Sequence, residues 1–242
     1  MKARLRGPLR WAVLSWKVFC YGLGLLVVAA LCVQLWLFAQ VLWWRSFDPA
    51  GTAFMEARLQ QLQSKDHGAK LRHQWVGYER ISVQLKRAVV AAEDAKFVGH
   101  EGFDWQAIAK AIERNEKEGK VVAGASTISQ QLAKNLFLSC DRSWLRKGEE
   151  AAITWMLEAA MSKRRILELY LNVAEWGEGV FGAEAAARFH FGANAASLSP
   201  QPAAFLAAIL PSPRRYAPGR ITPYVAGRIE TILARMPAAQ IP

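Results

Sequence analysis

Hydrophobic positions recur along most of this 242-residue chain with the 3.6-residue period of amphipathic helices. From residue 82 onward the pattern is nearly continuous, and the two-residue alternation typical of strands is nearly absent. It predicts helices over residues 82–92, 104–117, 127–137, 146–160, 163–173, 179–189, 200–210 and 222–236. A further helix is predicted over 54–64, a short extended piece over 74–76 and a charged loop over 113–120. The expected fold class is all-α, with helices stacked around a deep cleft.

An uncharged stretch of 27 residues runs from Val18 to Trp44. Because about 20 apolar residues cross a bilayer as a helix, this stretch predicts one transmembrane helix. It is too long for the apolar region of a signal peptide, and no small-x-small cleavage site follows it. A buried helix of a soluble protein is the alternative, but only Gln34 and Gln40 add strong polarity to the run. Trp43 and Trp44 are expected at the outer interface of the bilayer.

Charge is distributed unevenly around this stretch. Five basic residues and no acidic residue precede it, and the positive-inside rule therefore places the N-terminus in the cytoplasm. We expect a single-pass protein of the bacterial cytoplasmic (inner) membrane with a periplasmic domain. Of the formal net charge of +11, the remaining 26 basic and 20 acidic residues contribute +6. A basic domain outside the cytoplasm suits anionic lipid headgroups or a pyrophosphate ligand, and nucleic acid is not an expected partner.

The predicted organisation is a cytoplasmic basic segment (1–17), a transmembrane helix (18–44), a linker (45–80) and one domain (81–242). Cys140 is the only cysteine of the exported part, so no disulfide is expected within it. No metal-ligand spacing relates the four histidines, and no glycine-rich nucleotide loop occurs. The motif Ser-x-x-Lys is also absent, which excludes the acyl-serine chemistry of transpeptidases.

Residues 93–102 read Glu-Asp-Ala-Lys-Phe-Val-Gly-His-Glu-Gly and follow an apolar helix. A carboxylate at a helix C-terminus meets the negative end of the helix dipole, which disfavours its charged form and raises its pKa. That shift suits a general base working near neutral pH. Glu93 and Asp94 are therefore candidate site residues, and Phe97 and His100 crowd the same loop. The alternative is a solvated acidic turn, or a carboxylate paired with Lys96.

Residues 124–135 read Gly-Ala-Ser-Thr-Ile-Ser-Gln-Gln-Leu-Ala-Lys-Asn. Thr127 has capping-box spacing to the glutamine three residues later, with Ser126 as a rival cap. On the helix that begins here, Thr127, Gln131 and Lys134 share one face. Free amides and a hydroxyl at a helix start, beside an amide and an ammonium, are typical of an anion site. An amphipathic helix with a solvated polar face is the alternative.

Residues 146–150 read Arg-Lys-Gly-Glu-Glu and open the next helix. Glu150 falls on the apolar stripe of that helix, where a carboxylate is costly unless it is paired or functional. It is a second candidate for catalysis, and a structural Arg146–Glu150 pair is the alternative. The amphipathic segment from Lys163 to Asn172 is predicted to be architectural, with Lys163 as a weaker anion contact.

These four blocks, in this order, resemble the peptidoglycan glycosyltransferases (glycosyltransferase family 51), and specifically their monofunctional members. The resemblance covers roughly residues 65–218. It implies a lysozyme-like all-α fold and an enzyme that polymerises lipid II into β-1,4-linked glycan strands and releases undecaprenyl diphosphate. An inverting transfer of this kind needs one base and cationic help for the departing diphosphate. One departure is Pro202, which stands where the family has a glutamate, and a shifted helix start is expected there.

The resemblance also implies roles for individual residues. Glu93 is the implied base for the acceptor 4-hydroxyl, and Glu150 is implied as the second catalytic carboxylate, near the leaving group. The implied substrate-binding residues are Asp94, Phe97, His100, Ser126, Thr127, Gln131, Lys134, Asn135, Arg146 and Lys163. No cofactor is required on this basis, although the family is associated with a divalent cation, Mg²⁺ or Mn²⁺, near Glu150.

Expected partners are lipid II, the growing glycan strand and the lipid bilayer, with cell-division or penicillin-binding proteins as candidate protein partners. Two alternative functions stay open at this point. A lysozyme-like hydrolase would also use two carboxylates to cut the same polymer, but it has no pyrophosphate to bind. A non-catalytic cell-wall scaffold would need neither carboxylate.

Overall fold

The computed structural model describes residues 6–120, 124–138, 144–216, 218–219 and 221–242. Lys2, Arg4 and Cys140, which entered the topology and disulfide predictions, lie outside the described residues. The chain divides into two compact units, Met1–Trp43 and Trp44–Pro242.

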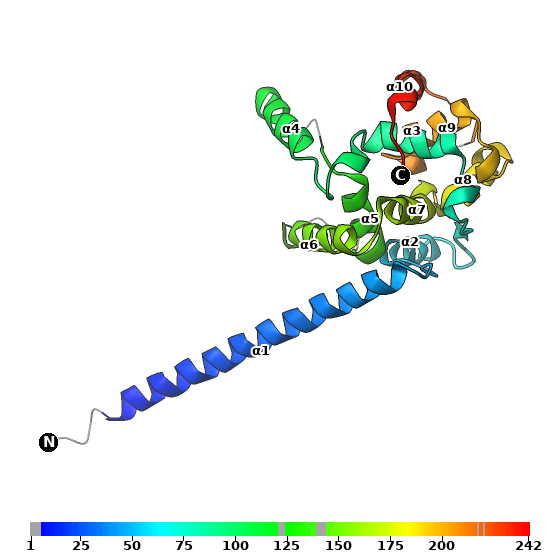
Figure 1. The fold of residues 1–242 in the computed structure, drawn as a ribbon. Coiled ribbons are helices and arrows are strands. Elements are labelled where there is room, and N and C mark those ends of the chain that lie inside the picture. The colour runs from blue at the N-terminus through cyan, green and yellow to red at the C-terminus, as the bar shows by residue number, and fades with distance from the viewer. Residues whose placement is uncertain (1–5, 121–123, 139–143, 217, 220) are drawn as a thin grey trace. The chain divides into compact units, whose positions relative to one another are not determined.

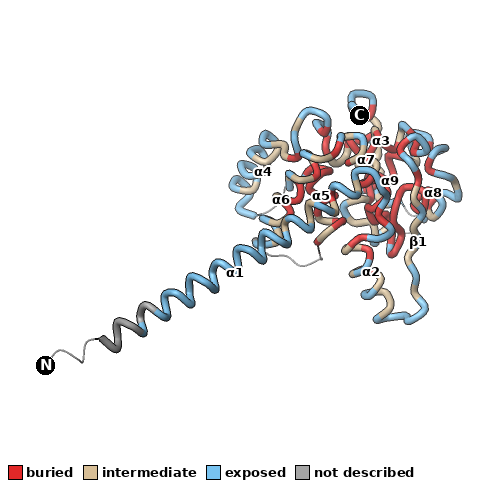
Figure 2. Tube along the Cα trace, turned by 60° about the horizontal axis from the view of Figure 1, so that its bottom comes forward, coloured by how far each residue is buried: buried red, intermediate tan, exposed pale blue. Residues whose placement is uncertain are grey.

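The first unit is built on one long helix, α1 (Arg6–Trp44), drawn in blue in Figure 1. Its apolar part, Leu14–Trp44, contains 31 residues, which at 1.5 Å per residue extend over about 47 Å. That length exceeds the hydrocarbon core of a bilayer, which is about 30 Å thick. Leu25 and Trp36 are 73% and 65% exposed, and Figure 2 shows exposed residues along the helix. The helix therefore fits the predicted single-pass membrane anchor.

The second unit is mostly helical, which confirms the predicted fold class. Its helices are α2 (Ala53–Gln63), α3 (Val83–Glu93), α4 (Trp105–Glu118), α5 (Ile128–Phe137), α6 (Trp144–Ala160), α7 (Lys163–Val173), α8 (Ala183–Phe191), α9 (Pro200–Ile209) and α10 (Pro223–Arg235). Short 3₁₀ turns occur at Tyr78–Arg80, Phe97–Gly99, Ala195–Ser197, Pro213–Arg215 and Met236–Ala238. Helix α3 packs on α9 and α9 on α10, while α5 lies against both α6 and α7 (Figure 1).

A small sheet was not predicted from the sequence. It contains β1 (Arg72–His73), β2 (Glu175–Gly177) and β3 (Val180–Phe181) in the order β1–β3–β2. Strand β3 runs parallel to β1 and antiparallel to β2. Strand β1 directly precedes the extended piece expected over 74–76. The helix start expected at 179 is wrong, because residues 180–181 form β3 and α8 begins at Ala183. Gly179 makes the turn between β2 and β3 with a φ of 68°, a conformation that glycine adopts without a steric penalty.

The charged segment 113–120 is mostly helix, and the prediction of a loop there was wrong. Helix α4 continues to Glu118, and Gly119 ends it with a left-handed φ of 63°. The Lys117 ammonium lies 2.7 Å from the Glu113 carboxylate at i,i+4 spacing, and pairs of this kind support an exposed helix. None of the α4 residues is buried.

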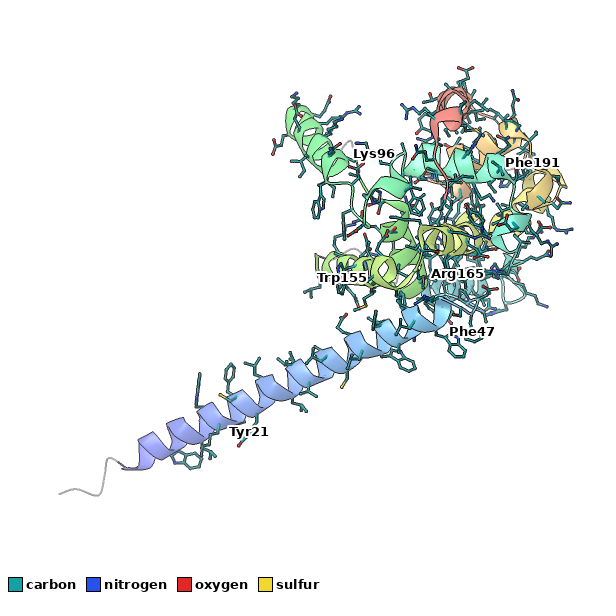
Figure 3. All side chains as sticks on the ribbon, viewed as in Figure 1. Tyr21, Phe47, Lys96, Trp155, Arg165 and Phe191 are labelled. Atoms are coloured by element: carbon teal, nitrogen blue, oxygen red, sulfur yellow. The ribbon has the colours of Figure 1, made fainter. Side chains whose placement is uncertain are left out.

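Residues 45–80, expected to form a linker, belong to the second unit. Thr52 caps α2 by accepting a hydrogen bond from the Met55 amide at 3.2 Å. Arg165, in the first turn of α7, lies beside Phe47 (Figure 3). Its side chain donates to the carbonyl oxygens of Trp44 and Phe47 at 3.0 and 2.8 Å. It also pairs with Asp48 at 2.9 Å. These bonds hold the segment 44–48 against α7.

The start of α9 shows how the chain accommodates Pro202. Ser199 is the N-cap residue, and the helix begins at Pro200. Both prolines therefore lie in the first turn, where the amide hydrogens have no partner within the helix and their loss costs little.

Candidate active site

Glu93 is the last residue of α3, and its side chain is partly buried. The opposite end of this helix is fixed by Ser82, whose hydroxyl accepts a hydrogen bond from the Gln84 amide at 3.1 Å. Nε2 of Gln131, on α5, donates to Oε2 of Glu93 at 2.8 Å. The structure thus brings together the acidic motif and the polar helix that the sequence singled out separately.

Burial is the main reason why the pKa of Glu93 is raised above its ordinary value. The hydrogen bond from Gln131 and the positive charges of Arg228 and Lys134 oppose this rise, and the neighbouring charge of Asp94 adds to it. The direction agrees with the sequence prediction, but the cause differs, since desolvation outweighs any other contribution. A carboxylate whose pKa is raised accepts a proton more readily than an ordinary carboxylate does.

Asp94 is buried and connects the loop after α3 to the start of α5. Its Oδ1 lies 2.9 Å from Nε2 of His100. Its Oδ2 accepts a hydrogen bond from the amide of Ile128, the first residue of α5, at 3.1 Å. A negative charge is stabilised at a helix N-terminus. The bonds of Asp94 to His100 and to the Ile128 amide therefore fix the end of α3, where Glu93 lies, against the start of α5.

Thr127 caps α5 through the predicted capping box with Gln130. Its hydroxyl also donates to the carbonyl oxygen of Gly102 at 2.6 Å, and the residue is buried. Gly102 has a φ of 86°, and a Cβ there would lie 2.8 Å from Cγ2 of Thr154. The hydroxyl of Thr127 is thus used for structure, whereas Ser126 next to it is exposed.

Tyr170 of α7 completes the surroundings of Gln131. Its hydroxyl donates to Oε1 of Gln131 at 2.9 Å, and the residue is 1% exposed. Burial, followed by the charges of Glu93 and Asp94, raises the pKa of Tyr170 well above its ordinary value. Tyr170 therefore stays protonated and remains a hydrogen-bond donor. The sequence placed Tyr170 only within the segment from Lys163 to Asn172, which was predicted to be architectural.

A cleft of about 750 Å³ opens beside Gln131. It is lined by Phe54, Arg58, Gln131, Lys134, Asn135, Arg146, Tyr170, Ala174, Glu175 and the segment 210–215. Four of the predicted substrate-binding residues meet here, namely Gln131, Lys134, Asn135 and Arg146. The cationic side chains outnumber the single acidic one, so the cleft favours anionic ligands.

Three cationic residues of the cleft were missed by the sequence reasoning. Arg58 forms a bidentate pair with Glu175, with nitrogen–oxygen distances of 2.9 and 3.0 Å. The other two, Arg214 and Arg215, form part of a 3₁₀ turn in the loop between α9 and α10. The run Pro-Ser-Pro-Arg-Arg, in which prolines fix the backbone before two adjacent cations, is the sequence signal that could have indicated them.

Glu150 is 4% exposed and forms an ion pair with Lys147. Its burial agrees with the predicted position on the apolar stripe of α6. Across the described residues, no three His, Cys, Asp or Glu side chains gather as a metal site. The donor set around Glu150 therefore does not fit a metal ion held by the described residues alone.

Lys163 lies outside the cleft described above. Its ammonium donates to Oε1 of Glu158 at 2.7 Å and sits 4.6 Å from the centre of the Phe97 ring. Ser129 of α5 donates to the same oxygen of Glu158. Phe97 is fully buried. Lys163 thus joins α7 to α6 by a salt bridge and to the loop after α3 by a cation–π contact with Phe97.

The Transglycosylase family model matches residues 58–237 of this chain. The chain therefore belongs to the transglycosylase family, and the mostly helical fold of its second unit is the lysozyme-like fold of that family.

Individual relatives give the same result. The chain is 57% identical over 226 residues to the biosynthetic peptidoglycan transglycosylase of Methylobacillus flagellatus, covering 93% of this chain and 99% of that protein. A protein of the same name from Dechloromonas aromatica is 58% identical over 209 residues, covering 86% and 90%. A third, from Nitrosospira multiformis, is 54% identical over 233 residues, covering 96% and 98%.

The protein is thus a peptidoglycan glycosyltransferase, an enzyme of cell-wall biosynthesis. This membership decides against the hydrolase and the non-catalytic scaffold, the two functions that the sequence left open. The lack of a Ser-x-x-Lys motif fits the predicted monofunctional type.

Proposed function

We propose that this enzyme polymerises lipid II, with Glu93 as the general base. The observation that carries the proposal is the position of Glu93, a partly buried carboxylate of raised pKa joined through Gln131 to a cation-lined cleft. Lipid II combines a sugar hydroxyl that must lose a proton with a pyrophosphate that must leave. A base beside a cationic cleft meets both requirements.

The proposed step is a single inverting displacement. The 4-hydroxyl oxygen of the acceptor sugar attacks C1 of the donor sugar, and its proton passes to Glu93 as the new bond forms. The bond from C1 to the pyrophosphate oxygen breaks, and its electron pair leaves with undecaprenyl diphosphate. The α-linkage of the donor becomes a β-1,4 linkage. Glu93 then returns the proton to solvent.

The cations of the cleft are proposed to stabilise the charge that develops on the leaving group. Lys134 and Arg146 face the cleft from α5 and α6, and Arg214 and Arg215 face it from the opposite loop. Positive groups that are already in place when charge develops lower the barrier without reorganising at that moment. Asn135 adds a neutral amide to the same surface. Glu150 is proposed to orient Lys147 and Arg146 at this end of the site.

The proposed reaction requires no cofactor held by the protein. A divalent cation, Mg²⁺ or Mn²⁺, is proposed as a companion of the substrate pyrophosphate, because such ions bind one carboxylate together with phosphate oxygens. Glu150 is the carboxylate that would take part. Cell-division or penicillin-binding proteins are proposed as partners that receive the glycan strands.

The proposed orientation places residues 1–17 in the cytoplasm and the catalytic unit in the periplasm, where lipid II is exposed on the outer leaflet. The five basic residues before the apolar helix support this orientation. Alkaline phosphatase fused after Pro242 should be active in cells, and a reporter that matures only in the cytoplasm should be silent. The reverse pattern would contradict the orientation.

Incubation of the purified enzyme with labelled lipid II tests the proposed reaction. Lipid II should disappear into long glycan strands that carry no cross-links, because the Ser-x-x-Lys nucleophile of transpeptidases is absent. Penicillin should not inhibit this reaction, whereas a non-reactive lipid-pyrophosphate analogue should. Preformed peptidoglycan should remain intact. Release of soluble muropeptides from sacculi, without consumption of lipid II, would show that the substrate and reaction are wrongly assigned.

A further inference from the structure

Three side chains from three different helices form a continuous hydrogen-bonded chain that ends on Glu93. The Tyr170 hydroxyl, on α7, donates to Oε1 of Gln131 at 2.9 Å. Nε2 of Gln131, on α5, donates to Oε2 of Glu93 at 2.8 Å. Helices α5 and α7 pack directly on each other, so the chain is supported by the core and not by a loop.

The chain has a fixed direction. An ionised carboxylate can only accept hydrogen bonds, so the amide nitrogen of Gln131 must face Glu93. The amide oxygen of Gln131 then faces Tyr170, and the tyrosine must donate its proton. The whole arrangement is matched to the ionised form of Glu93, the form that a general base needs.

The two carboxylate oxygens of Glu93 also have different surroundings. Oε2 is held by Gln131. Oε1 has no hydrogen-bond partner within the described part of the chain. A carboxylate with one oxygen fixed and one available presents a defined lone pair to an incoming hydroxyl.

We infer that Gln131 and Tyr170 are positioning residues, which hold Oε2 of Glu93 so that Oε1 receives the proton of the acceptor hydroxyl. This inference rests on the proposed role of Glu93 as the base. It gives Gln131 a different role from the substrate contact expected from the sequence, although the same side chain also borders the cleft.

The charged groups around Glu93 act together with this chain. Lys134 of α5 and Arg228 of α10 favour the ionised carboxylate, and Asp94 disfavours it. Arg228 is itself anchored by a hydrogen bond from its Nε to the carbonyl oxygen of Ala208 at 3.2 Å. Tyr170 stays neutral, as its raised pKa requires. Removal of Gln131 or Tyr170 leaves these charges in place, so a shift of the acidic limb in their variants reports on the lost hydrogen bonds.

The test compares Gln131→Met and Tyr170→Phe with the wild type in steady-state assays on labelled lipid II across a range of pH. Loss of the Gln131 N–H removes a hydrogen bond to the charged form, which raises the pKa of Glu93. The acidic limb of the kcat/KM profile should move to higher pH by roughly one unit in Gln131→Met. Loss of the Tyr170 hydroxyl in Tyr170→Phe leaves the side-chain amide of Gln131 free to rotate. The acidic limb should therefore move to higher pH in this variant too, by less than in Gln131→Met. At neutral pH kcat should fall by about tenfold with KM nearly unchanged, as for an interaction made in the transition state.

Matched substitutions at exposed positions serve as controls. Tyr21→Phe on α1 and Gln60→Leu on α2 remove the same chemical groups from exposed side chains, and their profiles should match the wild type. Thermal midpoints show whether each variant is folded. Tyr170→Phe keeps the buried ring and remains informative if Gln131→Met does not fold.

The outcomes separate this inference from the proposed base. If Glu93→Gln keeps near wild-type turnover, the base is wrongly assigned and the inference fails with it. If Glu93→Gln is inactive but the acidic limb stays in place in both Gln131→Met and Tyr170→Phe, only the positioning role is wrong. A large rise in KM with an unmoved limb would identify Gln131 as a substrate contact instead.

Discussion

Replacement of Glu93 by glutamine is expected to lower the rate of lipid II polymerisation by about 10²–10⁴-fold, the usual contribution of a positioned general base. Glutamine has nearly the same shape and keeps an oxygen that can accept the hydrogen bond from Gln131. It cannot accept the proton of the acceptor hydroxyl. Formation of glycan strands from labelled lipid II is the measurement, with Glu116→Gln on the exposed side of α4 as the matched control. Near wild-type turnover in Glu93→Gln would refute the mechanism.

The same variant should be at least as stable as the wild type at neutral pH. Burial raises the pKa of Glu93 in the folded state, so folding favours the protonated carboxyl. Above the raised pKa the buried charge opposes folding, and below the unfolded pKa of about 4.3 this effect disappears. Glutamine is uncharged and removes the free-energy cost of burying the ionised carboxylate. Any gain in the stability of Glu93→Gln over the wild type should therefore shrink as pH falls. Thermal unfolding at several pH values measures this difference.

Replacement of Lys134 by alanine is expected to lower turnover by about 10²–10³-fold, the typical effect of removing one preorganised group that stabilises developing charge. Lys134 lies one turn after Gln131 on α5 and borders the cleft. Its charge also lowers the pKa of Glu93, so the acidic limb of kcat/KM should move to higher pH in the variant. The side chain is only partly buried, and stability should change little.

Binding of a lipid-pyrophosphate analogue isolates the anion contact from catalysis. Lys134→Ala should bind the analogue more weakly than the wild type does. Lys117→Ala on α4 removes the same charge from an exposed residue outside the cleft lining and should bind normally. Equal affinity of Lys134→Ala and wild type for the analogue would show that the cleft is not the pyrophosphate site.

The helices could be predicted from the sequence because their signals are local. The capping box of Thr127 is contained within four residues, and the predicted helices 163–173 and 200–210 match α7 and α9 closely. The sheet could not be predicted in the same way. Its strands contain two or three residues each, and Arg72 pairs with Val180 across more than a hundred positions.

The candidate site was predictable in its residues but not in their partners. Gln131 and Lys134 were identified because they share one face of a helix, and both border the cleft. The pattern could not show that Tyr170 bonds to Gln131 or that Arg58 pairs with Glu175, because these contacts join distant segments. Thr127 shares the predicted face, yet its hydroxyl is used by the Gly102 carbonyl.

The pH dependence of kcat/KM on lipid II tests the central claim most directly, because that parameter reports ionisations of the free enzyme. The wild type should lose activity on the acidic side with an apparent pKa above about 4.3, the ordinary value for glutamate, since burial raises the pKa of Glu93. Circular dichroism at each pH shows that the fold is intact. The residual activity of Glu93→Gln should not show this loss on the acidic side of the kcat/KM profile. An acidic limb that persists unchanged in Glu93→Gln would contradict the assignment of Glu93 as the base.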